Sequence, residues 1–389
     1  MAVATVVALA ALFQPLVASR VPSHPNAACA VFTLPVPVSV QQPVYDIAHV
    51  DNDIEATQFA INADTWSFPQ PSERVVNNIT IDETFDISVQ LCVPDEQAKR
   101  SSLHLATHGW VFDKRYWDVI VNPSEYSYVQ AALDNGYSIL TYDRLGTGLS
   151  DKPNAYTTVQ FPVEIAILSK MTELARTGDI LTLAKKSNHA LPHVTFEKVI
   201  HVGHSTGTFL SSAVISLFPG LSDAAVLTGL PPNKYLNALK ATSIGFKRSR
   251  GSWPSGYIAG DGRAFQVGFF SDRRNASGFG GFEPGLLEYG NSIQQPITVG
   301  EWQSSHSIPP PSASKFTGPV QYVVAEYDFI ACLGNCKNTY TLDSLEALFP
   351  NVADLDVYIQ PATGHGLTMH RGARVGYQAT FDWLAEQGL

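Results

Sequence analysis

The most constraining stretch of this chain is VIHVGHSTGTFLSSAVI, residues Val199–Ile215. Its apolar, largely β-branched beginning predicts a strand, and the small residues after Gly207 follow a helical pattern, so Ser205 lies at a sharp strand-to-helix turn. Such a turn can hold a serine hydroxyl above a sheet as a nucleophile, because Gly203 and Gly207 leave room for neighbouring backbone. An ordinary Gly-Ser loop would have the same sequence, and the remaining motifs must distinguish the two interpretations.

Strand and helix patterns alternate from about Leu103 to the carboxyl terminus. This alternation predicts an α/β fold, a doubly wound and mostly parallel sheet covered by helices on both faces. One long helix is expected over residues 161–187, and a closing helix over 373–387. The predicted strands span residues 103–110, 137–148, 198–205, 223–230, 319–328 and 354–365.

The alternation of strand and helix patterns stops between residues 231 and 318, which are rich in Gly, Ser, Pro and aromatic residues. The stretch is too long for a plain loop, so we expect an inserted cap or lid domain that divides the core into residues 103–230 and 319–389. Residues 20–102 precede the core. Within them we expect an extended arm up to about Pro43, followed by an antiparallel hairpin over residues 77–94.

The amino terminus resembles an export signal. Residues Ala2–Ala18 are almost wholly apolar, and small residues follow, so residues 1–19 are interpreted as a signal peptide. Glycosylation sequons at Asn78 and Asn275 agree with a secreted protein or one of the secretory-pathway lumen. A membrane anchor is the alternative interpretation of this segment, although Gln14 and Pro15 interrupt the apolar run.

The cysteines allow three pairings, because the chain contains four: Cys29, Cys92, Cys332 and Cys336. In an exported protein an even number favours disulfides. Cys332 and Cys336 are close enough in sequence to close a small loop, which leaves Cys29 to pair with Cys92. Four reduced, buried thiols are the alternative if the protein is not exported.

Charge and motifs exclude several classes of function. The formal net charge of −10 argues against a nucleic-acid partner, and no later segment is apolar enough to span a membrane. No His/Cys/Glu set has the spacing of a metal site, and GxGxxG and P-loop motifs are missing, so we expect no cofactor. No obligate protein partner is implied.

A nucleophilic serine needs a base and an acid late in the chain. His365 follows a well-patterned strand, at the carboxyl end where catalytic groups gather in parallel sheets. His370 is the alternative base, but it lies further into the turn, and we expect its loss to be mild. Glu326 and Asp328 both end the preceding strand and point to one face, so spacing cannot choose between them. Asp328 lies beyond the apolar part of the strand, where reach is easier, and is the preferred acid.

Backbone donors for an oxyanion are expected at two amides. Thr206 begins the helix after the serine, and Trp110 follows the first core strand in the sequence THGW. These residues, the sequence YDRLGTGLS at residues 142–150, and the motifs around Ser205, Asp328 and His365 occur together. On these motifs the chain resembles α/β-hydrolase-fold serine enzymes of the secreted fungal type. The resemblance covers residues 103–389 and implies a Ser-Asp-His order along the chain.

This resemblance implies a hydrolase that cleaves an ester or lactone of a small-to-medium apolar molecule through an acyl-enzyme. A cyclase or acyltransferase with the same residues, or a binding protein that has lost catalysis, is the alternative function. Serine in the turn argues against the aspartate-nucleophile members of the fold. Five residues are expected to contact substrate: Trp110, His204, Trp253, Tyr257 and Phe269.

Overall fold

The computed structural model describes residues 23–65, 67–95, 99–233, 245–249, 251, 253–261, 269–270, 281–308 and 313–389. The expected signal peptide, residues 1–19, and the sequon at Asn275 lie outside the described residues. In the part of the chain that the structure describes, no helix has the length and the apolar content to cross a membrane.

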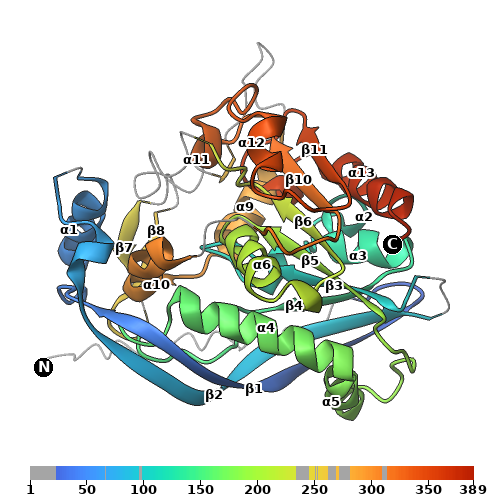
Figure 1. Ribbon diagram of the computed structural model, residues 1–389, viewed down its shortest axis with the longest axis horizontal. Coiled ribbons are helices and arrows are strands. Elements are labelled where there is room, and N and C mark those ends of the chain that lie inside the picture. The colour runs from blue at the N-terminus through green and yellow to red at the C-terminus, as the bar shows by residue number, and fades with distance from the viewer. Residues whose placement is uncertain are drawn as a thin grey trace, which may run out of the picture.

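A single eight-stranded sheet forms the centre of the molecule, in the order β1-β2-β4-β3-β5-β6-β10-β11 (Figure 1). Strands β3 to β11 of this sheet run parallel, whereas β1 and β2 run antiparallel at one edge. The strands are β1 Ala27–Tyr45, β2 Val75–Pro94, β3 Ser102–Thr107, β4 Ser138–Tyr142, β5 Lys198–His204, β6 Ala224–Thr228, β10 Val320–Ala325 and β11 Leu355–Gln360. The expected doubly wound, mostly parallel sheet is confirmed.

Helices cover both faces of the sheet because the winding direction reverses at β3, which lies between β4 and β5. Helices α3 and α13 contact each other on one side, and α4, α5 and α6 contact each other or β1 on the other. The helices are α1 Asp53–Asp64, α2 Pro123–Tyr126, α3 Tyr128–Asp134, α4 Phe161–Thr177, α5 Asp179–Ser187, α6 Thr206–Leu217, α9 Pro284–Ser292, α10 Val299–Ser304, α11 Phe329–Cys332, α12 Leu342–Glu346 and α13 Ala373–Glu386.

The expectation for residues 20–94 was wrong in its pairing. The extended arm is strand β1, and the segment expected to be a hairpin belongs to one continuous strand, β2, that pairs with β1 along its whole length (Figure 1). The polar centre Asp82-Glu83-Thr84 is an exposed part of this ribbon rather than a turn. Pro35 and Pro37 are tolerated in β1 because it is the edge strand of the sheet.

The single helix expected over residues 161–187 is interrupted at Gly178. This glycine has a φ of 83° and separates α4 from α5. A left-handed residue ends a helix because the chain turns away from the helix axis, and glycine adopts it without a side-chain clash. The change of direction brings α5 against β1, so the break serves the packing of the amino-terminal ribbon.

The segment between β6 and β10 contains the described part of the expected cap. Three short strands form a separate sheet, namely β7 Phe246–Arg248, β8 Tyr257–Gly260 and β9 Ile297–Thr298. Helix α1, which lies in the connection between β1 and β2, packs against β7. Helix α10 contacts α4 and β1, so both the cap and the amino-terminal ribbon surround the same side of the core.

The fully buried histidines in or beside the central sheet include His104, His108 and His201. Burial lowers the pKa of each from 6.5 to about 3, because a charged imidazole would lose its hydration, and nearby cations act in the same direction. The folded protein therefore keeps these rings neutral at moderately acidic pH, where an unfolded chain would protonate them.

This difference predicts acid-sensitive stability. Between pH 6.5 and about 3 the unfolded chain binds protons that the folded chain does not, so the free energy of unfolding falls as the pH falls. Replacing one buried ring, His104→Phe, should reduce the loss of stability between pH 6.5 and 5 by about 1.5 kcal/mol relative to wild type. Urea denaturation at both pH values measures this. The exposed His189→Phe is the matched control, and an equal change in both variants would contradict the assignment.

Candidate active site

Ser205 lies on a strained turn between β5 and α6. Its φ of 54° and ψ of −117° are sparsely populated for a residue with a side chain. The flanking glycines permit the turn through close backbone contacts. A Cβ at Gly203 would lie 2.4 Å from the carbonyl oxygen of Gly207, and a Cβ at Gly207 would lie 2.1 Å from that of Thr107. Both glycines are therefore explained by the lack of space for a side chain at this turn. The stretch is a strand-turn-helix unit and not an ordinary Gly-Ser loop.

A histidine and a carboxylate lie in line with Ser205. The Nε2 atom of His365 lies 2.8 Å from Ser205 Oγ, and its Nδ1 lies 2.6 Å from Asp328 Oδ2. His365 follows β11 and Asp328 follows β10, so all three residues meet at the carboxyl ends of parallel strands. Asp328 and His365 are fully buried and Ser205 is 7% exposed. This arrangement lets the serine hydroxyl donate to Nε2 while Nδ1–H donates to the carboxylate.

Contacts separate Asp328 from Glu326, which sequence spacing could not do. Glu326 Oε1 forms an ion pair with Lys337 Nζ at 2.6 Å, and Glu326 Oε2 accepts a hydrogen bond from the amide of Ala362. Burial alone would raise the pKa of Glu326, but these two donors lower it below its usual value. Asp328 instead accepts from His365 and, as the N-cap of α11, from the amide of Ala331 at 2.7 Å.

The other histidine near the serine is His204, which was expected to contact substrate. It is fully buried and stacks on Tyr116 with ring centroids 4.4 Å apart, while the His365 ring lies 5.0 Å away. Burial and the neighbouring histidines hold the pKa of His204 well below 6.5. The His204 ring therefore stays neutral beside His365, and its contact with substrate stays a prediction.

The loop after β3 passes directly against the serine. A Cβ at Gly109 would lie 2.8 Å from Ser205 Cβ, so Gly109, which precedes Trp110, packs against the serine side chain. The amide of Thr206 begins α6, where the helix dipole favours negative charge. The Trp110 indole points elsewhere, because it stacks on Trp302 at 5.1 Å and donates to Glu301. The backbone amide of Trp110 is the candidate oxyanion donor, and contact of its indole with substrate stays a prediction.

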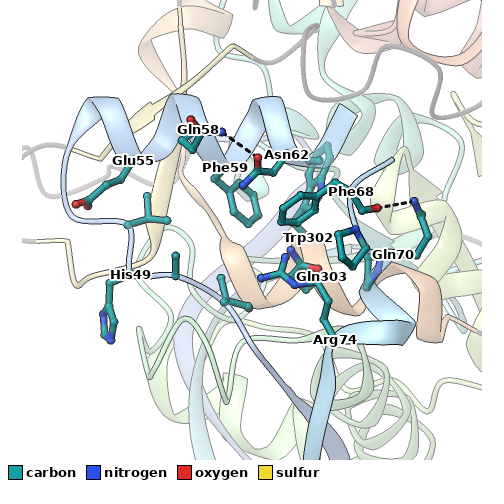
Figure 2. Close-up of a pocket in the computed structure, with 16 residues that line it drawn as sticks. His49, Glu55, Gln58, Phe59, Asn62, Phe68, Gln70, Arg74, Trp302 and Gln303 are labelled. Atoms are coloured by element: carbon teal, nitrogen blue, oxygen red, sulfur yellow. Dashed lines mark hydrogen bonds between the residues drawn. The ribbon is translucent and has the colours of Figure 1, made fainter. Parts of the chain in front are cut away.

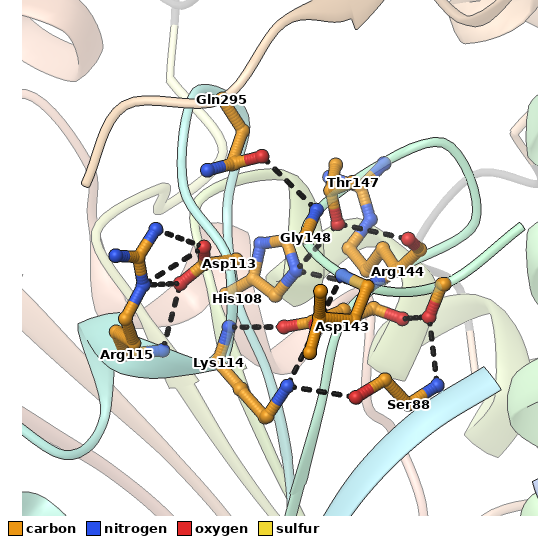
Figure 3. A network of polar contacts seen from close by, with 12 residues as sticks. Ser88, His108, Asp113, Lys114, Arg115, Asp143, Arg144, Thr147, Gly148 and Gln295 are labelled. Atoms are coloured by element: carbon orange, nitrogen blue, oxygen red, sulfur yellow. Dashed lines mark hydrogen bonds and ion pairs between the residues drawn. The ribbon is translucent and has the colours of Figure 1, made fainter. Parts of the chain in front are cut away.

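A buried polar network holds this loop against the loop after β4 (Figure 3). His108 Nε2 accepts from the amide of Arg144 at 3.0 Å, and its Nδ1 donates to the carbonyl of Gly109. Lys114 forms a 2.6 Å ion pair with Asp143. The sequence YDRLGTGLS thus holds the loop after β3 in place through Asp143 and the amide of Arg144, contacts that the motif alone did not reveal.

Arg144 itself joins the core to the cap. Its guanidinium is 1% exposed and pairs with Glu164 of α4 and with Glu301 of α10. Burial raises the pKa of Glu164, and the charge of Arg144 acts against this shift. Neither partner is near Arg144 in sequence, and no local pattern marks them, which is why sequence reasoning missed the cluster.

The expected cap aromatics divide into two groups. The Phe269 ring lies edge-on to His365 with centroids 5.1 Å apart, so it borders the reacting groups. Trp253 packs on Tyr257 and on the ammonium of Lys152, and Tyr257 donates to the carbonyl of Pro153. Through these contacts Trp253 and Tyr257 pack against the loop that follows β4. Their contact with substrate stays a prediction.

A hollow beside the site is lined by α1, residues 68–71 and α10 (Figure 2). Phe59, Phe68 and Trp302 form its aromatic walls, and neither Ser205 nor His365 lines it. Because Trp302 also stacks on Trp110, one indole separates this hollow from the loop next to the serine.

The disulfides follow the pairing that cysteine spacing favours. Cys29 and Cys92 are directly opposite in the β1–β2 register and are bonded, and Cys332 is bonded to Cys336 in the loop after Asp328. His24, Cys29 and Cys92 bring potential metal-ligand atoms within 4.8 Å of one another, but the bonded cysteines have no thiolate to offer. Asn78, the described sequon, is exposed on β2.

Comparisons with known proteins agree with the observed sheet. The profile of the alpha/beta hydrolase family matches residues 105–376. No curated protein matches the chain by sequence. Among solved structures, the bromoperoxidase from Bacillus anthracis is 17% identical with a TM-score of 0.51, covering 78% of this chain and 96% of its own. A thermophilic esterase from Thermogutta terrifontis is 13% identical with a TM-score of 0.50, covering 78% and 95%. Such low identities establish the fold alone.

The Arg144 cluster predicts a large loss of stability on truncation. Arg144→Met removes the cation between two buried carboxylates and should lower the free energy of unfolding by about 3–5 kcal/mol. Adding Glu164→Gln should restore part of this loss, because one of the unpaired charges disappears. Urea denaturation measures both. The exposed Lys170–Glu173 pair is the control, and Lys170→Met should cost less than about 1 kcal/mol. Similar losses at the two pairs would refute this account.

Proposed function

Because the chain belongs to the alpha/beta hydrolase family, we propose that it is a serine hydrolase that cleaves an ester or lactone bond. The observation that carries the proposal is the line of contacts from Ser205 through His365 to Asp328, at 2.8 Å and 2.6 Å. A hydroxyl becomes a useful nucleophile when a base can take its proton and a carboxylate can stabilise the resulting cation.

In the proposed first half-reaction, Ser205 Oγ attacks the substrate carbonyl carbon and His365 Nε2 takes the hydroxyl proton. Asp328 stabilises the imidazolium through Nδ1–H. The carbonyl oxygen becomes an oxyanion, which accepts hydrogen bonds from the amides of Thr206 and Trp110. When the tetrahedral intermediate collapses, the C–O bond to the leaving group breaks and His365 returns the proton to the departing alcohol.

In the second half-reaction, water takes the place of the alcohol. His365 removes a proton from this water, the hydroxide attacks the acyl carbon, and Ser205 departs with the proton held by His365. The products are a carboxylic acid and the free enzyme. If a hydroxyl of the acyl group itself attacks instead of water, the same residues form a lactone, so product identification separates hydrolysis from cyclisation.

The proposed substrate is an uncharged ester or lactone of small to medium size. Phe269 borders His365, and burial keeps the neighbouring His204 and His108 neutral, which supports an apolar substrate over an anionic one. The fold by itself does not select the reaction, because an esterase and a bromoperoxidase share it. The complete set of contacts around Ser205 favours an enzyme over a binding protein.

We further propose that the protein is exported. Two disulfides support folding in an oxidising compartment, and the exposed Asn78 is accessible to glycosylation. The signal-peptide interpretation of residues 1–19 rests on sequence alone.

Loss of the nucleophile should remove activity without loss of the fold. On a panel of p-nitrophenyl esters and lactones, Ser205→Ala should lower kcat by at least about a thousandfold and abolish labelling by a fluorophosphonate. Ser211→Ala, at a buried serine of the same helix α6, is the matched control and should leave both unchanged. A folded wild-type protein that takes no label and turns over no member of the panel would refute the proposed function.

The two carboxylates after β10 should behave differently. Asp328→Asn should lower kcat by about a thousandfold or more, because the amide cannot hold His365 in the required tautomer. Glu326→Gln should change kcat by less than about threefold, since Glu326 contacts Lys337 rather than His365. Steady-state kinetics on one ester measures both variants, and the reverse order would assign the acid to Glu326.

A further inference from the structure

The loop between β11 and α13 carries a second buried histidine, His370, whose ring binds the backbone on both sides of His365. The amide of Gly364 donates to His370 Nε2 at 3.1 Å, and His370 Nδ1 donates to the carbonyl of Gly366 at 2.8 Å. One imidazole therefore brackets the peptide units that carry the proposed base. Because both ring nitrogens bind backbone groups, His370 is not available as an alternative base.

This bracket needs one protonation state of His370. Nε2 accepts a hydrogen bond, so the ring proton must be on Nδ1, which donates. A proton on Nε2, in the other tautomer or in the imidazolium, would place two N–H groups against each other at Gly364. The geometry thus requires a neutral ring with its proton on Nδ1.

The surroundings of His370 prevent water from taking over these hydrogen bonds. The ring is fully buried, stacks on Phe270 with centroids 5.6 Å apart, and meets the edge of Phe282 at 5.8 Å. Removal of the imidazole would leave Gly364 N–H without this partner in an apolar space, whereas Gly366 C=O would keep the amide of Met369 at 2.9 Å. A buried backbone group that loses its partner costs about 1–3 kcal/mol, so the loop would be driven to rearrange.

The same cap segment also holds the loop from outside. The amide of Gly366 donates to the carbonyl of Phe269 at 2.9 Å, and the Phe269 ring contacts His365. Phe269 and Phe270 are consecutive, so one short cap segment contacts both His365 and His370. The position of the proposed base is therefore determined jointly by His370 and by the cap.

Other contacts hold the remainder of the loop and do not involve His370. The amide of Tyr327 donates to the carbonyl of Thr363 at 2.8 Å, and Gln360 Nε2 donates to the carbonyl of Leu367 at 3.1 Å. These bonds fix the two ends of the turn. The short segment between them contains His365 and is held by the bracket, by the Gly366–Phe269 bond, and by the amide of Leu367, which donates to the carbonyl of His365 at 2.9 Å.

We infer that His370 is a positioning residue: its neutral ring holds the His365 segment at the distance from Ser205 and Asp328 that proton transfer requires. The inference rests on the proposed function, and it revises the expectation that loss of His370 would be mild. Displacements of about 1 Å in a catalytic group can reduce rates by about a hundredfold.

The test uses His370→Phe, which keeps an aromatic ring between Phe270 and Phe282 but removes both hydrogen bonds. With the best ester of the panel, kcat should fall by about ten- to a hundredfold while KM changes by less than about twofold. In proton NMR, the downfield resonance of the His365–Asp328 hydrogen bond should shift or broaden. Thr368→Val, at a buried threonine of the same loop, is the matched control and should leave kcat and the resonance unchanged.

An unchanged kcat and an unchanged resonance in folded His370→Phe would overturn the inference. An equal loss in Thr368→Val would also overturn it, because any disturbance of the loop would then suffice. A measurement on the wild type does not depend on how the variants fold. Nitrogen-15 NMR of labelled histidines should show His370 neutral with the proton on Nδ1 throughout the pH range of activity, and any other state would contradict the bracket.

These outcomes separate this inference from the proposed function. If Ser205→Ala retains ester turnover, the proposed function falls, whereas the tautomer of His370 is unaffected. If Ser205→Ala is inactive and His370→Phe turns over as wild type does, the function stands and the positioning role falls.

Discussion

The rest of the site depends on the close approach of the backbone segments around Ser205, at Gly203, Gly207 and the end of β3. Helix α6 can start immediately after β5 only because Gly203 and Gly207 have no side chain where the helix and the end of β3 come within van der Waals distance. The resulting turn forces Ser205 into a conformation with positive φ and points the helix dipole at the space above the sheet. The loops after β3, β10 and β11 then need only reach the same edge.

Buried polar contacts place those loops, and most of them join residues far apart in the chain. Arg144 connects α4 with α10, His108 connects the loops after β3 and β4, and Asp328 connects α11 with His365. In each of these three contacts, the loss of one partner would leave an unsatisfied group in an apolar interior. The cap and the core are therefore joined by electrostatic requirements as well as by apolar packing.

Sequence reasoning located the elements that short patterns mark, and it missed most contacts between residues far apart in the chain. The turn at Ser205 and the strand-end position of His365 follow from short patterns, and the parallel sheet follows from their alternation. Asp328 was preferred over Glu326 for its reach beyond the strand, and the contacts that distinguish the two, with His365 and with Lys337, are not visible in their spacing. The polar centre of β2 looked like a hairpin turn because exposed residues in a long ribbon and residues in a turn have the same composition. Arg144 has no local signal, since its partners lie on other helices.

The prolines of β1 have a consequence for how this molecule meets its neighbours. Pro35, Pro37 and Pro43 all occupy odd-numbered positions of β1. In a strand the backbone groups of alternate residues point to the same side, and at these three positions that side is away from β2. A foreign strand that approached this edge would find hydrogen-bond donors missing at each of these places, so it could not extend the ladder. The opposite edge, β11, carries no proline between Leu355 and Gln360. Unwanted association by strand addition is thereby disfavoured on one side of the sheet, and in a concentrated solution the β11 side would be the first to aggregate.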